Sequence, residues 1–314
     1  MSENKNLKAG MVYATLAYLG WGFFPIYWKF LQHVPVLQIL SHRVLWAFIF
    51  YTVILFYKER KLYFFRPDSA GSFLSLLLAS VLLMGNWLVY IYAVNSGQIV
   101  ESSLGYFINP LVNIGIGVLL LKERLSLFQT IATGFAAVGV LIISFAQGHI
   151  PWIAIFLAIT FSCYGLIKKK TSVSGLKSNQ FESLVFIPVA VLFLITQKQT
   201  WLVAENVPLT AFLLVGSGLI TGLPLIFFAE ATRRIPYYLL GFFQFLAPTI
   251  QFLTGVFIFG EPLSDLKFRG FIFIWFAGAL LIINTWWVSR AKNRNQNRNQ
   301  KRNQRRIAQQ GNAI

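Results

Sequence analysis

The chain offers little material for catalysis or metal binding. It has a single cysteine, Cys163, and three histidines, His33, His42 and His149, which fall in or near different connections. One thiol excludes an internal disulfide, and the histidines lack the spacing of a metal site such as HExxH. The sequence also lacks a phosphate-binding loop of the GxxxxGK[ST] type. We therefore expect no metal and no cofactor, and these residues argue against an enzyme.

The residues that could do chemistry are charged side chains inside apolar stretches, namely Arg43, Glu101, Glu182, Arg233 and Arg234. Each costs about 2.5–3.5 kcal/mol on insertion scales, so each needs a function or a partner. We hypothesise an outer cluster of Arg43 with Glu101. An inner cluster would join Glu182 to Arg233 or Arg234. Such clusters could act as alternating gates, or one carboxylate could carry a coupling proton. For Glu101, a side chain that snorkels to the lipid headgroups is an equal alternative.

Aromatic and polar residues gather on several of the same stretches and could line a binding site. Asn86, Trp87 and Tyr90 fit one helical face, because positions i, i+3 and i+4 lie together. An aromatic cavity with a few amide and hydroxyl groups suits an amphipathic or aromatic organic solute. Anchoring at the membrane interface is the alternative for Trp and Tyr near segment ends. The candidate binding residues of this kind are Trp21, Tyr27, Asn86, Trp87, Tyr90, Ser103, Tyr106, Asn109, Tyr164 and Gln244.

Two prolines, Pro110 and Pro248, complete the candidate site because each lies near the middle of an apolar stretch. Proline inside a helix leaves the carbonyl four residues earlier without its hydrogen bond, here those of Tyr106 and Gln244. In lipid such carbonyls must face protein or a water-filled cavity. Paired breaks at equivalent positions indicate a transport site. A simple packing kink is the alternative.

Membrane helices must position these residues. The 314 residues are 56% hydrophobic and only 12% charged, whereas about 25% of a soluble domain is charged. A spanning helix needs about 20 apolar residues. Ten such stretches lie near 8–28, 37–57, 71–94, 98–121, 125–146, 151–168, 179–198, 208–230, 237–259 and 267–289. The sequence predicts an all-α membrane protein with ten transmembrane helices, the first retained rather than cleaved as a signal peptide.

The distribution of lysine and arginine predicts the orientation. With the N-terminus in the cytoplasm, 22 of these residues lie inside and four outside, and 14 remain inside without the C-terminal tail. Cytoplasmic loops are rich in these residues, so we expect both termini in the cytoplasm. The basic, disordered tail at 290–314 has no acidic or aromatic residue. Contact with anionic lipid headgroups is therefore favoured over nucleic acid.

The two halves of the chain resemble each other. Residues 105–125 read GYFINPLVNIGIGVLLLKERL and residues 241–263 read GFFQFLAPTIQFLTGVFIFGEPL, with Glu123 and Glu261 each thirteen residues after the proline. We interpret 1–146 and 151–289 as two five-helix repeats. Since five is odd, the second repeat enters the membrane from the opposite side. An inverted repeat is typical of secondary transporters that alternate access, and a duplicated scaffold without transport is the alternative.

Several stretches resemble the RarD-type branch of the EamA family, in the drug/metabolite transporter superfamily. They are WGFFPIYWK (21–29), SHRVLW (41–46), GNWLVYIYAV (85–94), SLGYFINPL (103–111) and KERL (122–125). The similarity covers the chain up to about residue 289. It implies a ten-helix fold of two EamA repeats in a bacterial inner membrane. It also implies a carrier, often an exporter, of small metabolites or drugs.

These features together favour a secondary transporter that exports small organic metabolites or drugs, coupled to protons or to an exchange gradient. A non-transporting membrane scaffold or assembly factor is the alternative. An intramembrane enzyme acting on lipids is disfavoured by the scarcity of histidine. The sequence predicts neither the substrate nor the oligomeric state.

Overall fold

The computed structural model describes residues 2–95, 99–145, 151–196, 207–259, 265–266 and 268–280, and across these ranges every regular element is a helix. The helices are α1 Ser2–Gly22, α2 Phe24–Lys29, α3 Val36–Glu59, α4 Ala70–Asn95, α5 Ile99–Leu119, α6 Leu127–Phe145, α7 Trp152–Lys170, α8 Gly175–Thr196, α9 Val207–Arg234, α10 Tyr237–Gln244 and α11 Leu246–Phe257. One more apolar helix, Phe268–Leu280, follows them. The all-α class expected from the sequence is confirmed.

Seven of the described helices are long and apolar enough to cross a membrane. Two shorter apolar segments, Leu104–Leu119 and Phe268–Leu280, and the consecutive helices α10 and α11 occupy the other three expected positions. Ten spanning segments therefore fit the structure. Hydrocarbon offers the backbone no hydrogen-bond partners, so apolar runs of this length satisfy their own backbone as helices. Large apolar side chains such as Phe212 and Leu192 are exposed on the outside of the bundle, as a lipid-facing surface requires.

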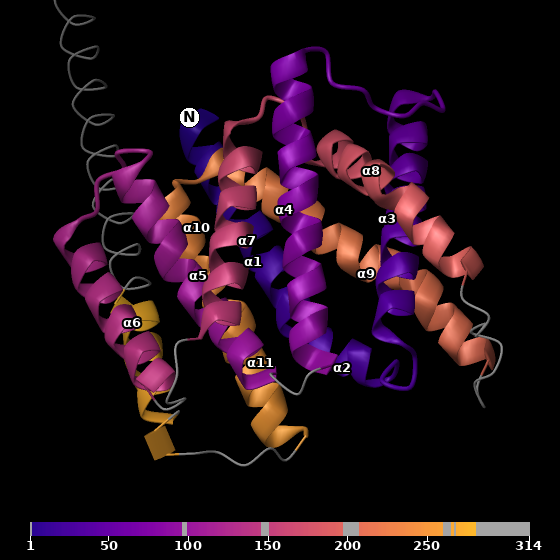
Figure 1. Cartoon of the computed structure of the whole chain (residues 1–314). Coiled ribbons are helices and arrows are strands. Elements are labelled where there is room, and N and C mark those ends of the chain that lie inside the picture. Colours follow the sequence, from indigo (N-terminus) through magenta and orange to yellow (C-terminus); the bar gives the residue numbers. More distant parts are fainter. Residues whose placement is uncertain are drawn as a thin grey trace, which may run out of the picture.

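The connections between helices alternate between the two ends of the bundle (Figure 1). The turns α3–α4, α5–α6, α7–α8 and α9–α10 lie at the end that also holds the N-terminus, whereas α2 lies at the opposite end. Each of these four turns has a basic residue in it or directly before it: Arg60, Lys122, Lys170 and Arg234. These four residues, which the charge count assigned to the cytoplasm, thus lie in or beside turns that share one end of the fold.

Helices of the two halves pack mainly against each other. Helix α1 lies on α9, α4 lies on α7, and α3 lies on both α8 and α9. Helix α5 contacts α7 and α10. A Cβ atom added at Gly218 of α9 would lie 2.3 Å from the backbone of Trp46 in α3, so only glycine allows this approach. The middle of the bundle is therefore built jointly by residues from both halves.

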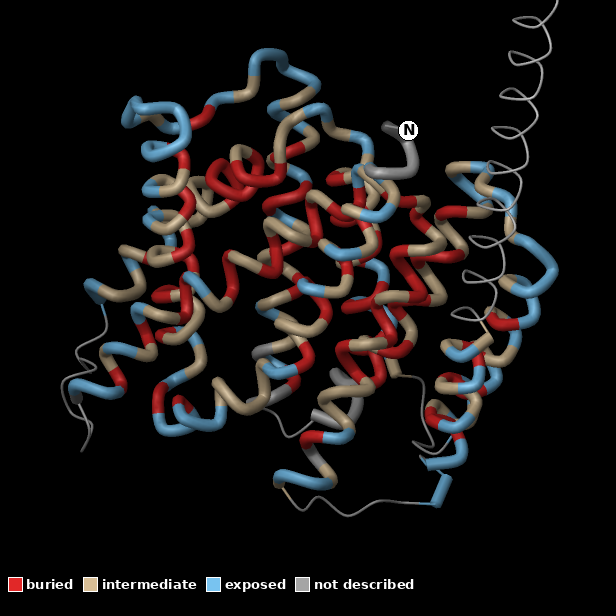
Figure 2. Tube along the Cα trace, turned by 180° about the vertical axis from the view of Figure 1, so that it is seen from behind, coloured by how far each residue is buried: buried red, intermediate tan, exposed pale blue. Residues whose placement is uncertain are grey.

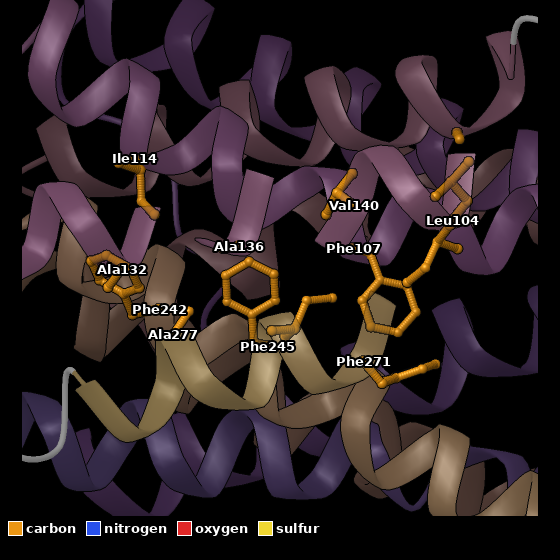
Figure 3. Close-up of a cluster of buried hydrophobic side chains, with 13 residues drawn as sticks. Leu104, Phe107, Ile114, Ala132, Ala136, Val140, Phe242, Phe245, Phe271 and Ala277 are labelled. Atoms are coloured by element: carbon orange, nitrogen blue, oxygen red, sulfur yellow. The ribbon is translucent and has the colours of Figure 1, made fainter. Parts of the chain in front are cut away.

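Two buried clusters hold the bundle together. Figure 3 shows the first, where Phe107 of α5, Ala136 of α6, Phe242 of α10 and Phe271 of the last described helix meet. The second joins α1, α4, α7, α9 and α10. Figure 2 shows the buried residues along the inner faces of the helices and the exposed ones at the periphery and at the ends. Some polar groups lie within these apolar clusters, and they define the candidate site.

Candidate functional site

A small cavity lies where α3 and α4 of the first half meet α8 and α9 of the second. Its volume is about 20 Å³, which holds about one water molecule. The apolar wall comprises Val44, Ala47, Leu83, Met84, Trp87 and Leu225, and the polar wall comprises Tyr51, Ser80, Asn179, Glu182 and Ser183. An organic solute can enter only if these helices move apart.

A buried ion pair borders the polar wall. Lys168 Nζ lies 2.5 Å from Glu182 Oε1, and the exposed fractions of the two side chains are 0% and 3%. The ammonium also donates to Ser178 Oγ and Asn179 Oδ1, each at 2.5 Å. The other carboxylate oxygen, Oε2, accepts from the hydroxyl of Tyr164 at 3.1 Å. All three N–H groups of the ammonium thus have an acceptor, which is the condition under which a buried pair is tolerated.

The inner pairing expected from the sequence is wrong. Glu182 pairs with Lys168, whereas Arg233 and Arg234 both lie against Glu230. The reason is local geometry, because Glu230 precedes the two arginines by three and four residues and shares their helical face. Arg233 and Arg234 are about a third exposed at the end of α9. They lie apart from the cavity.

Arg43 is enclosed by aromatic rings. Its guanidinium carbon lies 4.8 Å from the ring centre of Trp28 in α2 and 4.5 Å from that of Trp87 in α4. Its Nε donates to Thr221 Oγ1 of α9 at 3.0 Å. Cation–π contacts of this kind stabilise a desolvated arginine. Trp87 lines the cavity as well, so Arg43 borders the cavity through this ring.

The expected partner of Arg43 cannot be compared with this geometry. The side chains of Glu101 and Ser103 lie outside the described residues. The Arg43–Glu101 pair therefore stays a prediction. Tyr90 and Tyr106 lie close enough to interact electrostatically with Arg43, and their rings meet edge to face at 5.8 Å. These two candidate residues are thus brought together beside the arginine.

Trp21 and Tyr164 also come together, through other aromatic rings. Phe161 lies 5.6 Å from Trp21 and 5.7 Å from Tyr164, between ring centres. Phe228 contacts both of them and stacks on Tyr164 at 6.0 Å. The rings form a packed core rather than an open wall. Tyr27 lies elsewhere, where its hydroxyl donates to the carbonyl of Leu213 and ties α2 to α9.

The candidate amides make hydrogen bonds between the two halves. Asn86 Nδ2 donates to Leu157 O at 2.8 Å and to Thr160 Oγ1 at 2.9 Å, which joins α4 to α7. Asn109 Oδ1 accepts from Ser162 Oγ at 2.9 Å, which joins α5 to α7. Polar side chains commonly link membrane helices in this way. In this conformation both asparagines link helices, and neither lines the cavity.

The two candidate prolines differ in their effect on the helix. Helix α5 continues through Pro110, whereas the second-half helix is interrupted at Phe245 and Pro248 is the third residue of α11. The helices touch at this level, since a Cβ added at Gly241 would lie 2.6 Å from Pro110 O. One turn further along α5, Asn113 Nδ2 donates to Gln244 Oε1 at 2.5 Å.

A further helix break occurs at Phe23, between α1 and α2. Pro25 has no N–H to offer the carbonyl four residues earlier, which belongs to Trp21. That carbonyl accepts a hydrogen bond from Gln251 Nε2 of α11 at 2.9 Å. A side chain of the second half thus satisfies a backbone carbonyl of the first, in a partly buried position.

Glu123 clamps the basic end of the bundle. Its carboxylate accepts hydrogen bonds from the backbone N–H groups of Tyr237 at 2.8 Å and Tyr238 at 2.9 Å. These are the first two residues of α10, whose N–H groups have no partner within the helix and favour a negative charge. Lys169 of α7 reaches the same place, donating to Ile235 O at 2.8 Å. The α5–α6 turn is thereby fastened to the second half.

Comparison with known proteins gives the family. Residues 8–145 match the EamA-like transporter family. The chain is 41% identical over 279 residues to the uncharacterized transporter YojE of Bacillus subtilis, covering 88% of this chain and 94% of that protein. It is 36% identical over 295 residues to protein RarD of Escherichia coli, covering 93% and 100%. The chain is a RarD-type member of the EamA family.

Because the chain belongs to this transporter family and its relatives are named transporters, this RarD-type chain is a membrane transporter. A crystal structure of another protein shares the fold, with a TM-score of 0.70, 16% identity and coverage of 87% of this chain and 97% of that one. Among the described residues of the RarD-type chain, no group of three or more His, Cys, Asp or Glu could hold a metal ion.

Several site residues of this RarD-type chain were missed by sequence reasoning. Lys168 was not among the predicted site residues, although it follows Tyr164 by four residues and so shares its face. Asn179 lies three residues before Glu182, and Ser183 lies directly after it. Nothing in the sequence indicates a partner for Gln251. Pro25 is indicated only by being a proline within an apolar stretch. Lys168 and Glu182 lie on consecutive helices, 14 residues apart, and Gln251 lies 230 residues from Trp21. The spacing of residues within one helix reveals neither contact.

Proposed function

We propose that this RarD-type protein is a secondary carrier that exports small organic metabolites or drugs across the bacterial inner membrane. It works by alternating access around the cavity between α3, α4, α8 and α9. The observation that carries the proposal is the position of this cavity, where helices of both halves meet beside two cationic groups, the half-buried Arg43 and the fully buried Lys168. Rocking of one half against the other would open the cavity first to one side and then to the other.

The packing pattern supports an inverted pair of repeats, 1–146 and 151–289. If α1, α3, α4 and α5 correspond to α7, α8, α9 and α10, then exchanging the halves maps the α1–α9 contact onto the α4–α7 contact. The same exchange maps the α3–α8 and α5–α10 contacts onto themselves. It also maps the α5–α7 contact onto the packing of α10 and α11 against α1. A two-fold axis between related halves predicts this pattern.

The charge distribution supports the orientation. Four turns with basic residues share the end that holds the N-terminus, and cytoplasmic loops are rich in such residues. Both termini would then lie in the cytoplasm, and the basic segment 290–314 would contact anionic headgroups there. The carrier would take small organic solutes as substrates and use protons or a second solute for coupling.

Counterflow in proteoliposomes tests the carrier function. Vesicles are loaded with one unlabelled solute at a time from a broad panel of amphipathic metabolites and drugs, and entry of the labelled form is followed. We expect labelled solute to overshoot its equilibrium level for at least one compound. The cavity-filling change Ser183→Phe should abolish that overshoot, whereas Leu192→Phe, on the exposed face of the same helix, should leave it intact. No exchange for any compound would favour a membrane scaffold instead.

A further inference from the structure

The Lys168–Glu182 pair lies at a position suited to a coupling site. Lys168 was not among the coupling residues predicted from the sequence. We propose that Glu182 binds the proton that drives this carrier, and that proton binding releases Lys168 and lets α7 part from α8 at the basic end of the bundle. The proposal rests on the carrier function proposed above and names its coupling ion and one of its gates.

The pair ties α7 to α8, the helix that carries Asn179, Glu182 and Ser183 of the cavity wall. Lys168 is in the last turn of α7, and its three acceptors, Ser178, Asn179 and Glu182, all belong to the first half of α8. When Glu182 takes up a proton, the carboxylate becomes a neutral acid and Lys168 becomes a buried cation without a counter-charge. A buried cation of that kind is strongly destabilised. The ammonium would therefore move to water and α7 would follow.

The cavity gives the proton a path to Glu182. Glu182 lines the cavity, although it is almost fully shielded from solvent. The side-chain nitrogen of Asn179, which also lines the cavity, is buried and has no hydrogen-bond partner among the described residues. Asn179 itself is 1% exposed. Because the cavity holds about one water molecule, a water there could accept from Asn179 and exchange a proton with Glu182.

Other ionisable groups face the pair from each packed helix, and none duplicates its position. Tyr51 of α3 and Tyr164 of α7 are neutral phenols beside Glu182. Glu230 and Arg233 of α9 act on Lys168 from further away. The cavity wall from α4 consists of Ser80, Leu83, Met84 and Trp87, none of which titrates. Glu230 is itself paired with Arg234 at the end of α9.

Infrared difference spectroscopy tests proton binding without any knowledge of the solute. The full-length protein in vesicles is titrated from alkaline to acidic pH, and the C=O stretch of a protonated carboxylic acid is followed. We expect a band that Glu182→Gln removes and that Glu182→Asp shifts in frequency. Glu230→Gln should retain the band, because that carboxylate is outside the cavity. A band unchanged in both Glu182 variants would overturn the proposal.

Thiol accessibility tests the gate. Ser183→Cys is placed in a Cys163→Ser background, and a membrane-impermeant maleimide is added to inside-out vesicles, with labelling normalised to the unfolded protein. We expect labelling to rise as pH falls, opposite to the intrinsic reactivity of a thiol. In Glu182→Gln it should be high at every pH, and in Glu230→Gln it should follow the parent. If labelling of the parent protein does not depend on pH, the proposed gate is wrong.

The experiments can contradict the proton site and the carrier function independently of each other. If counterflow succeeds while neither the infrared band nor the labelling depends on Glu182, the carrier remains and this coupling site is wrong. If the Glu182 band and the pH-dependent labelling are present but no solute exchanges, the proton site remains and the carrier function is wrong.

Discussion

The carboxylate of Glu123 accepts a hydrogen bond from the backbone N–H of Tyr237 at 2.8 Å, across 114 residues of sequence. This contact fastens the α5–α6 turn of one half to the first turn of α10 in the other. Lys122, directly before Glu123, adopts a left-handed conformation with φ 55°, which non-glycine residues seldom do. The turn is therefore shaped to present the carboxylate.

Glu123→Ala should destabilise this end of the bundle. Loss of a carboxylate that caps a helix N-terminus costs about 0.5–2 kcal/mol, and here two N–H groups lose their acceptor. Thermal unfolding in detergent should show a lower midpoint. The matched control is Glu59→Ala, which removes an exposed pair with Lys177 and should leave the midpoint nearly unchanged. Equal shifts in the two variants would contradict the clamp.

Arg43→Lys should impair solute exchange while the protein remains folded. Lysine keeps the charge but loses the planar guanidinium that stacks between Trp28 and Trp87. Loss of about 1–2 kcal/mol of cation–π interaction corresponds to a fall in counterflow of roughly 5- to 30-fold. Arg233→Lys, at the end of α9, is the control and should exchange normally. If Arg43→Lys retained full activity, the contacts of the guanidinium with Trp28 and Trp87 would not be needed for transport.

The predicted pair of Arg43 with Glu101 has its own test. Arg43→Glu and Glu101→Arg should each abolish counterflow, because each leaves two like charges inside the membrane. The double exchange restores opposite charges and should recover part of the activity. If the double variant is no better than either single variant, the two residues do not pair.

Gly241→Ala should be destabilising because α10 and α5 touch at this residue. The added Cβ would lie 2.6 Å from Pro110 O, a backbone atom that cannot easily move. Overpacking of this kind costs about 1–3 kcal/mol, which thermal unfolding can measure. Gly115→Ala, in α5, meets no atom within 4 Å and should be neutral or slightly stabilising. A neutral Gly241→Ala would mean that the helices are not in contact there.

The hydrogen bond from Gln251 to Trp21 O can be isolated with a double-mutant cycle. Gln251→Leu removes the donor to the carbonyl that Pro25 leaves free, and it should cost about 0.6–1.7 kcal/mol. Pro25→Ala supplies a backbone N–H for the same carbonyl. In that background the cost of Gln251→Leu, measured by unfolding, should shrink. An unchanged cost would show that the side chain does not compensate for the proline.

The sequence predicted the helices better than their contacts. Apolar run length is a strong signal because lipid imposes it, so the ten expected positions fit the described helices, with breaks at Phe23 and Phe245. Side-chain partners are different, because each depends on how the helices are placed in space. Glu182 shows this most clearly, since the sequence predicted Arg233 or Arg234 as its partner, whereas the structure brings Lys168 of the preceding helix to it.

The candidate solute ligands show the same limit. The sequence predicted Asn86 and Asn109 as candidate solute ligands, and both instead have partners within the protein. Their partners are Leu157, Thr160 and Ser162 of α7 rather than groups lining the cavity. A buried amide is equally suited to binding a solute and to joining helices, so residue type alone does not separate the two roles. Of the predicted residues whose side chains the structure describes, only Trp87 and Glu182 line the cavity.

The most direct test of alternating access is the reactivity of one cavity residue from both sides of the membrane. In the Cys163→Ser, Ser183→Cys protein, an impermeant maleimide is added to sealed right-side-out and inside-out vesicles. We expect labelling from both faces. A cross-link between cysteines replacing Glu123 and Tyr238, which fixes the clamped end, should eliminate labelling from the inside and preserve it from the outside. Labelling from one face alone, or from both faces with the cross-link in place, would contradict alternating access around this cavity.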